Sequence, residues 1–370
     1  MQQRVIISQD IEHDLVQAIA ETEHDRVFVL TDDITQECCL PKVAVLFAKH
    51  NATTITIRHD DTNKTLATLA DVWTALQWGG ATRRSLLVHL GGGMVTGLGG
   101  FAAATFKRGI NFINIPTTLL AMVDAAVGGK TGINFGGLKN EVGAFANARY
   151  VIVNTCFLDT LDTANLCSGY AEMLKHSLIS NAQMWAEHVN FDILQPDLAE
   201  LQRMVAASIA VKEHIVADDP HEHGIRKALN FGHTIGHALE EFSMQQQGGA
   251  VVSARLLPLA RARTAPKNTL LHGYAVAFGL IGELYISARK AGFPTARLHQ
   301  TARFIRENYG AVAFTCDDYP TLLNLMRHDK KNTSDTINFT LLHDIGDIRI
   351  NQTATDEEIR EALDFIREGY

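Results

Sequence analysis

Residues 89–106 read HLGGGMVTGLGGFAAATF, and this stretch decides the fold of the first half of the chain. An apolar strand that ends at Leu90 runs into Gly91, Gly92 and Gly93 and then into a helical pattern. Glycines let the backbone approach a pyrophosphate closely, and a helix N-terminus offers N–H donors and the positive end of its dipole. The glycine spacing is not the dinucleotide-binding fingerprint, however, and a purely structural glycine turn explains the pattern equally well.

Short β-branched runs surround this stretch and continue to about residue 160. We expect strands at Arg26–Leu30, Val43–Phe47, Thr53–Arg58, Leu86–Leu90, Phe112–Ile115 and Tyr150–Asn154, with helices between several of them. This alternation is typical of a mostly parallel sheet covered by helices. Asp32 follows the first of these strands, where its carboxylate could accept hydrogen bonds from an adenosine ribose; a turn-forming aspartate is an equally good interpretation.

Beyond about Thr160 the β pattern fades and long amphipathic segments follow. These segments are Ser168–Ile179, Asp197–Ala217, Lys227–Phe242, Tyr274–Ala291 and Pro294–Asn308. We expect a short strand pair at Thr336–Leu342 and Ile348–Asn351, and then a closing helix from Asp356 that Thr355 caps. The sequence therefore predicts an α/β domain over residues 1–160 and a mainly α-helical domain over residues 161–370. Residues 245–268, with paired glycines and two prolines, read as a loop-like insertion.

The composition excludes several classes of function. A net charge of −8 and a pI of about 6.0 give no general field that would attract nucleic acid or anionic lipid. The five cysteines show no CxxC spacing, which predicts a reducing compartment and no disulfide framework. Charges near the N-terminus exclude a signal-peptide core, and no stretch approaches the roughly 18 apolar residues of a membrane span. We therefore expect a cytoplasmic protein that binds neither nucleic acid nor membrane.

A second glycine-rich stretch, residues 124–145, reads DAAVGGKTGINFGGLKNEVGAF. Lys130 and Lys139 lie among its glycines with Asn140 beside them, so ammonium groups and backbone donors could face one phosphorylated ligand. A single surface lysine is usually only a solvated charge. Two in an otherwise apolar stretch favour an anion-binding site.

The third signal is LNFGHTIGHALE at residues 229–240, followed later by LHGYAVAFG. His233 and His237 are four residues apart on one helical face, and His272 begins another helix. With a carboxylate, such histidines suit a zinc site that keeps an open coordination position. Glu172 is the best candidate because it lies in an apolar helix, where an unpaired charge is costly. The spacing leaves open whether both His233 and His237 bind metal or one of them transfers protons.

Taken together, these motifs resemble those of the 3-dehydroquinate synthases in order and spacing. The resemblance covers roughly Arg26–Asn332 and rests on GGGMVTGLGGFAAATFKRG, NIPTTLLAMVDAAVGGKTGIN, LKNEVGAF, GYAEMLKH, GIRKALNFGHTIGHALE, LHGYAVAFGL and DKKN. It implies a Rossmann-like N-terminal domain that binds NAD and a mainly α-helical C-terminal domain that binds zinc, with cobalt also suited to the ligands. The implied reaction, a step of the shikimate pathway, converts 3-deoxy-D-arabino-heptulosonate 7-phosphate to 3-dehydroquinate and phosphate. Transient oxidation by NAD, phosphate elimination, re-reduction and intramolecular aldol closure make up that reaction.

The resemblance also implies a role for each matching residue. Glu172, His233 and His272 match the zinc ligands, and His237 matches a histidine that helps hold the phosphate and relay protons. The other expected catalytic residues are Asp124, Lys130, Lys175 and Glu222, and the expected substrate-binding residues are Asn140, Lys212, Arg226, Asn230, Lys330 and Lys331. The positions that match the NAD site are Asp32, Lys64, Gly92, Gly93, Thr117, Thr118, Lys139, Thr160 and Leu161. Arg108 matches an arginine that reaches the phosphate of the neighbouring subunit, which implies a homodimer.

Two features depart from the family pattern. Gly97 stands where the family usually has an aspartate that contributes to the cofactor site, so we expect weaker NAD binding. The insertion separates His233 from His272 by 39 positions, about twice the usual spacing. A surface loop of this length is tolerable because closure entropy grows slowly with loop length.

Three alternatives follow from these observations. A related sugar-phosphate cyclase would build an amino or valiolone-type ring with the same cofactors, but Glu222, Arg226 and Lys212 favour a carboxylated substrate. A polyol dehydrogenase on the related fold would accumulate NADH. A folded but catalytically impaired homologue would bind ligand without turnover, and Gly97 and the insertion motivate that possibility.

Overall fold

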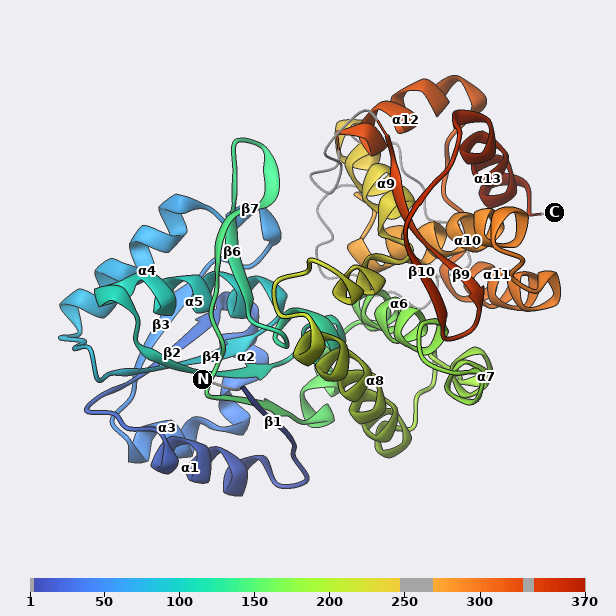
Figure 1. Ribbon diagram of the computed structural model, residues 1–370. Helices are drawn as coiled ribbons and strands as arrows, with labels where there is room; N and C mark the ends of the chain where they lie inside the picture. The colour runs from blue at the N-terminus through green and yellow to red at the C-terminus, as the bar shows by residue number, and fades with distance from the viewer. Residues whose placement is uncertain (1–2, 247–268, 329–335, 370) are drawn as a thin grey trace. The chain divides into compact units, whose positions relative to one another are not determined.

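The computed structural model describes residues 3–246, 269–328 and 336–369, and the chain forms two compact units. The first unit comprises Met1–Leu161 with Asp197–Ile209, and the second comprises Asp162–Pro196 with Ala210–Tyr370. The expected combination of an α/β part with a mainly α-helical part is confirmed (Figure 1).

A six-stranded parallel sheet forms the core of the first unit, in the order β1-β8-β5-β4-β2-β3. Its strands are β1 (Arg4–Ile7), β2 (Val27–Asp32), β3 (Thr53–Ile57), β4 (Leu86–Gly91), β5 (Asn111–Pro116) and β8 (Tyr150–Val153). Every residue of β2, β4 and β8 is buried. Strands covered on both faces read as continuous apolar runs, which explains why the sequence predicted them.

Helices cover both faces of this sheet, with α4 and α5 on one side and α1 and α3 on the other (Figure 1). The helices are α1 (Ile11–Glu21), α2 (Asp33–Cys38), α3 (Ala44–Lys49), α4 (Leu66–Trp78) and α5 (Gly93–Thr105). Shorter helical turns are η1 (Leu40–Lys42), η2 (Asp61–Asn63), η3 (Phe106–Arg108), η4 (Ala121–Ala125) and η5 (Thr155–Thr160). The first half of α8 (Leu198–Asp218) also belongs to this unit, where the Gln202 amide donates to the Ser8 carbonyl oxygen at 2.9 Å.

The strand expected at Val43–Phe47 is wrong, because this segment forms the start of α3. Val43, Leu46 and Phe47 are the buried residues, and their spacing of three and four positions is the period of a helix. The prediction gave too much weight to the β-branched and aromatic composition of the segment, which is a weaker signal than periodicity.

The glycine-rich stretch at residues 124–145 contains an antiparallel hairpin that the sequence analysis did not predict. Strands β6 (Lys130–Phe135) and β7 (Leu138–Phe145) pair with each other and not with the six-stranded sheet. Gly136 and Gly137 connect them with φ values of 60° and 85°. A two-residue turn with two positive φ angles strongly favours glycine, which accounts for this pair.

The second unit is mainly helical. Its elements are α6 (Thr163–Leu178), α7 (Ala182–Asn190), the rest of α8, η6 (Ile225–Asn230), α9 (His233–Gln245), α10 (His272–Lys290), α11 (Thr295–Tyr309), η7 (Cys316–Asp318), α12 (Tyr319–Arg327), β9 (Asn338–Asp344), β10 (Asp347–Thr353) and α13 (Asp356–Glu368). The predicted closing strand pair and helix are confirmed, and the Thr355 hydroxyl caps α13 by accepting the Glu358 N–H at 3.2 Å.

The continuous helix expected at Lys227–Phe242 is wrong at its start. The chain forms the 3-10 turn η6, breaks at Phe231 and Gly232, and begins α9 at His233. Gly232 has a φ of 80°, in the left-handed region that favours glycine and ends a right-handed helix. The break matters for function because it makes His233 the first residue of α9.

Two expected features lie outside the described residues. They are most of the insertion, at residues 247–268, and the Lys330–Lys331 pair. Within the described residues, none of the helices is both long and apolar enough to cross a membrane.

Candidate active site

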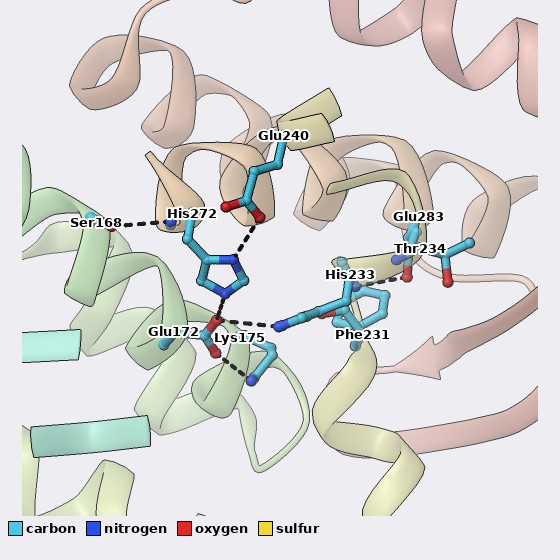
Figure 2. A network of polar contacts seen from close by, with 11 residues as sticks. Ser168, Glu172, Lys175, Phe231, His233, Thr234, Glu240, His272 and Glu283 are labelled. Atoms are coloured by element: carbon cyan, nitrogen blue, oxygen red, sulfur yellow. Dashed lines mark hydrogen bonds and ion pairs between the residues drawn. The ribbon is translucent and has the colours of Figure 1, made fainter. Parts of the chain in front are cut away.

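Helix α6 carries a buried ion pair. Glu172 and Lys175 are 0% and 1% exposed, and the Lys175 ammonium donates to Oε2 of Glu172 (Figure 2). Burial alone would raise the pKa of Glu172, but the Lys175 ammonium and the His233 imidazole hold that pKa well below its usual range. The carboxylate is therefore ionised, and its second oxygen, Oε1, faces other partners.

Two imidazoles meet this second oxygen, each from the start of a helix. His233 begins α9 and His272 begins α10, and Nε2 of each lies 3.4 Å from Oε1 of Glu172 (Figure 2). The start of α10 packs tightly on α6, where the Gly273 N–H donates to the Ser168 hydroxyl at 3.1 Å. A Cβ atom at Gly273 would lie 1.8 Å from the Ser168 carbonyl oxygen. Glycine is thus required there for His272 to approach Glu172.

Hydrogen bonds at the other ring nitrogens orient both imidazoles. Nδ1 of His233 lies 3.1 Å from the Phe231 carbonyl oxygen, and Nδ1 of His272 lies 3.0 Å from Oε2 of Glu240. A neutral imidazole that donates from Nδ1 keeps a lone pair on Nε2. Two imidazole nitrogens and one carboxylate oxygen therefore converge, and each nitrogen would offer its lone pair to a metal ion that displaces the proton.

This donor set fits a metal ion. The three ligand atoms of Glu172, His233 and His272 lie within 4.8 Å of one another. Ligands held tetrahedrally at 2.0–2.1 Å from zinc are about 3.3 Å apart, close to the 3.4 Å between Oε1 and each Nε2. Oε1 is buried and forms no hydrogen bond within the described residues. Three protein ligands leave a fourth position for substrate, as catalytic zinc sites require, and cobalt suits the same donors.

His237 lies next to this cluster but faces different neighbours. Its ring centroid is 5.2 Å from that of His233 and 5.9 Å from that of His272. Potential ligand atoms of His237, Glu240 and His272 form a second group within 4.8 Å. His233 therefore shares a group of potential ligand atoms with Glu172, whereas His237 shares one with Glu240.

Glu240 is a site residue that the sequence analysis missed. It is 4% exposed, and its carboxylate orients His272. Burial would lower the pKa of His272, but the carboxylates of Glu240 and Glu172 outweigh burial and raise it to about 10. The signal was present in the sequence, because Glu240 lies three positions after His237 and seven after His233 and therefore on the same helical face.

Four more of the expected catalytic and substrate-binding residues belong to the second unit, on α8 and on the segment that follows it. The Asn230 amide donates to Oε1 of Glu222 at 2.7 Å, while Arg226 and Lys212 are only 2% and 6% exposed. The Asp219 carboxylate holds the loop in place by accepting three backbone N–H groups at 2.7 to 3.1 Å. A buried cation on a segment held in this way, such as Arg226, suits an anionic group such as a carboxylate or phosphate.

In the first unit, the strand order places the glycine-rich turn at a topological switch point. From β2 the chain continues to the neighbouring β3, whereas from β4 it continues in the opposite direction to β5. Ligands of such sheets bind beyond the carboxyl ends of the strands at this point. Gly92 precedes α5 there, and the Thr117 N–H donates to the Gly91 carbonyl oxygen at 3.0 Å. A Cβ atom at Gly92 or Gly93 would lie 3.0 Å from Thr118 or Ala125, respectively.

Asp32 also lies at the switch point, at the end of β2. Its carboxylate caps α2 by accepting the Thr35 N–H at 2.7 Å, so the turn-forming interpretation describes its local contacts. Burial raises the pKa of Asp32, and the hydrogen bonds from Thr35 oppose this effect.

The Lys64 side chain lies against Gly97, the position where the family resemblance led us to expect an aspartate. A Cβ atom at Gly97 would lie 2.9 Å from the Lys64 ammonium nitrogen. Lys64 is 7% exposed and donates to Oδ1 of Asn140 at 2.5 Å. Two expected ligand-binding residues, Lys64 and Asn140, therefore contact each other beside Gly97.

The remaining expected residues of the first unit are spread over several elements. The Lys139 ammonium lies 3.5 Å from Asp61, and exposed Arg108 ends η3 with a φ of 69°. The others are Asp124 in η4, Lys130 at the start of β6, Thr160 at the end of η5 and Leu161 directly after it.

The fold, a parallel α/β unit combined with a mainly helical unit, is shared with several solved structures. One is a 2-deoxy-scyllo-inosose synthase complexed with carbaglucose-6-phosphate, NAD+ and Co2+. It is 23% identical, with a TM-score of 0.81 over 98% of this chain and 95% of that chain. Another is the 2-epi-5-epi-valiolone synthase of Streptomyces hygroscopicus with NAD+ and Zn2+ bound, 23% identical, with a TM-score of 0.80 over 99% and 97% of the two chains. At this identity the likeness shows the fold.

Sequence comparison gives the family. Residues 54–168 match the 3-dehydroquinate synthase N-terminal family, and residues 169–257 and 260–332 match the C-terminal family. The 3-dehydroquinate synthase of Parabacteroides distasonis is 50% identical over 369 residues, which are 100% of this chain and 99% of that protein. The chain belongs to the 3-dehydroquinate synthase family.

Proposed function

We propose that this protein is a 3-dehydroquinate synthase, a carbon–oxygen lyase that eliminates phosphate from 3-deoxy-D-arabino-heptulosonate 7-phosphate and closes the carbocycle. The convergence of Glu172, His233 and His272 carries the proposal, because it supplies a metal site with an open position in a chain of this family. The 3-dehydroquinate synthase that matches the whole chain at 50% identity supports this substrate.

The metal site belongs to the second unit. Glu172, His233 and His272 would hold zinc, and bound zinc and NAD would supply polarisation of a substrate hydroxyl and a hydride acceptor that later returns the hydride. The Lys175 ammonium occupies Oε2 of Glu172, keeps the carboxylate ionised and leaves Oε1 for the metal. His237, adjacent to both ligand histidines, would transfer the proton at the substrate oxygen.

In the second unit, positively charged residues would hold the negative charges of the substrate. In the second unit, Lys212 and Arg226 are buried cations that suit the substrate carboxylate, and Glu222 holds the Asn230 amide in place. Lys330 and Lys331 are proposed to add further positive charge. Fixed groups of this kind convert ring opening and aldol closure into proximity-assisted steps.

The first unit would bind the cofactor and contribute further polar groups. Asp32, Lys64, Gly92, Gly93, Thr117, Thr118, Lys139, Thr160 and Leu161 are the proposed NAD-binding residues. The topological switch point, where a glycine turn meets the start of α5, supports this assignment because helix N-termini bind pyrophosphate. Asp124, Lys130 and Asn140 are proposed to act on the substrate.

A substrate panel tests the proposed specificity. Purified protein with zinc and NAD should release phosphate from 3-deoxy-D-arabino-heptulosonate 7-phosphate but not from sugar phosphates that lack a carboxylate. Arg226→Met should raise the KM for the carboxylated substrate by more than tenfold. Equal or faster turnover of a carboxylate-free sugar phosphate would identify a different sugar-phosphate cyclase.

We further infer a homodimer in which Arg108 completes the neighbouring subunit's site. Its exposure and its position at the end of η3 support this role. Arg108→Ala and Glu172→Gln should each be inactive alone. A mixture that exchanges subunits should regain activity, because one site of each heterodimer then has both residues. A mixture that stays inactive after verified exchange contradicts the shared site.

A cytoplasmic location is also proposed. All five cysteines are free thiols, as expected for a protein kept in a reducing compartment.

A further inference from the structure

Helix α9 begins without a capping side chain of its own. Its N-cap residue is Gly232, and no side chain at that position accepts a hydrogen bond. The first backbone N–H groups of a helix have no partners within the helix and need acceptors from elsewhere. At most helix starts a serine, threonine, aspartate or asparagine fills this need, and a glycine cannot.

A buried carboxylate from another helix fills the need instead. Glu283 of α10 is 0% exposed and lies beside Thr234 (Figure 2). Its Oε2 accepts the Gly232 N–H at 2.7 Å, and its Oε1 accepts the N–H groups of Thr234 at 2.9 Å and Ile235 at 3.2 Å. These are charge-assisted hydrogen bonds, and a negative charge at this position also favours the helix dipole. Glu283 therefore fixes the first turn of α9, which includes His233.

Close backbone packing makes this contact specific. A Cβ atom at Gly232 would lie 2.7 Å from the Leu280 side chain, and one at Gly279 would lie 1.9 Å from the Gly232 carbonyl oxygen. The start of α9 thus rests directly on the backbone of α10, with glycine on both sides. Little room remains for another residue to replace the three hydrogen bonds of Glu283.

The same helix supplies the other imidazole. His272 is the first residue of α10, and Glu283 follows eleven positions later, which is about three turns or roughly 16 Å along the same helical face. The first residue of α10 is therefore His272, and Glu283, three turns later in the same helix, holds the start of α9, the helix that carries His233. The positions of both imidazoles therefore depend on α10, which carries His272 and holds the start of α9.

We propose that Glu283 is a positioning residue for metal binding, which fixes His233 against Glu172 and His272 by clamping the start of α9. This inference rests on the proposed metal site. Without the clamp, the first turn of α9 loses its hydrogen-bond acceptors and His233 loses its fixed place. Residues that orient metal ligands typically change metal affinity by 10- to 100-fold when they are replaced.

Zinc affinity of the whole protein, measured by competition with a chromophoric chelator, tests the proposal without using activity. Glu283→Gln keeps the shape of the side chain but places an amide NH2 group against an N–H donor, and it should weaken zinc binding by about 10- to 100-fold. Glu283→Asp is a second variant in case Gln does not fold. Its shorter side chain cannot reach all three donors, so its affinity should fall as well.

Thr355→Ala is the matched control, because it removes a capping side chain from α13, where no metal ligand is proposed. Its zinc affinity should equal that of the wild type, although its thermal stability should fall. Unchanged zinc affinity in both Glu283 variants overturns the proposal. Equal weakening in Thr355→Ala also overturns it, because the effect would then reflect stability alone. A wild-type protein that binds no zinc would instead refute the proposed metal site itself.

Discussion

Replacing Glu172 with glutamine leaves the Lys175 ammonium buried without its counter-charge. Both side chains are essentially inaccessible to water, at 0% and 1% exposed, so solvent cannot stabilise the remaining cation. Breaking a buried pair in this way costs about 3–5 kcal/mol. We expect the free energy of unfolding of the metal-free second unit to fall by that amount, since bound metal would add its own stabilisation to the wild type.

Urea denaturation of metal-free protein measures this change. In a Trp73→Phe, Trp78→Phe background, the fluorescence of Trp185, which is 6% exposed in the second unit, reports on that unit. Asp347→Asn is the matched control. Asp347 pairs with Arg349 in the same unit at 3.1 Å, but the two side chains are 42% and 53% exposed. A surface pair of this kind contributes at most about 1 kcal/mol.

A double variant sharpens the test. Glu172→Gln with Lys175→Met removes the stranded charge and should be more stable than Glu172→Gln alone, because an apolar replacement of a buried pair is often tolerated. A loss below about 1 kcal/mol in Glu172→Gln refutes the assigned role of the pair. A double variant less stable than the single one would refute it too.

Three further predictions concern the proposed metal site and the proposed NAD site. In metal-free protein the pKa of His272 is about 10, above its usual 6.5. The protonated imidazole therefore stabilises the folded state fully below pH 6.5, and this contribution is lost as the pH rises to 10. The free energy of unfolding, measured by urea titration, should fall over that range. Glu240→Ala removes the carboxylate that orients His272 and should weaken zinc binding by about 10- to 100-fold in a chelator competition assay. Gly97→Asp places a carboxylate beside the buried Lys64 ammonium, and NAD binding measured by calorimetry should become several-fold tighter. An unchanged dissociation constant for NAD would contradict the view that Gly97 weakens the cofactor site.

Local periodicity and composition predicted the strands of the parallel sheet and most helices of the second unit. The buried strands β2 and β4 and the closing helix α13 with its Thr355 cap carry their signals within a few residues. The failure at Val43–Phe47 arose where composition and periodicity disagree, and periodicity decided the structure.

The candidate metal site could be predicted from the sequence in part. The spacing of His233 and His237, together with His272 and one acid in an apolar helix, indicated a metal site but left open which of the two histidines binds. The choice of Glu172, His233 and His272 came from the family resemblance. The role of Glu283 could not be predicted, because its hydrogen bonds reach backbone groups 48 to 51 positions earlier in the chain. Its sequence context is that of an ordinary helical glutamate, and only the packing of α9 on α10 gives it three donors.

Phosphate release from 3-deoxy-D-arabino-heptulosonate 7-phosphate, followed together with NADH absorbance, tests the central claim most directly. The purified protein with zinc and NAD should release phosphate and form 3-dehydroquinate in equal amounts, with no net NADH. Chelation should stop the release, and added zinc should restore it. Accumulation of NADH in proportion to product, or phosphate release that survives complete metal removal, would contradict the proposed function.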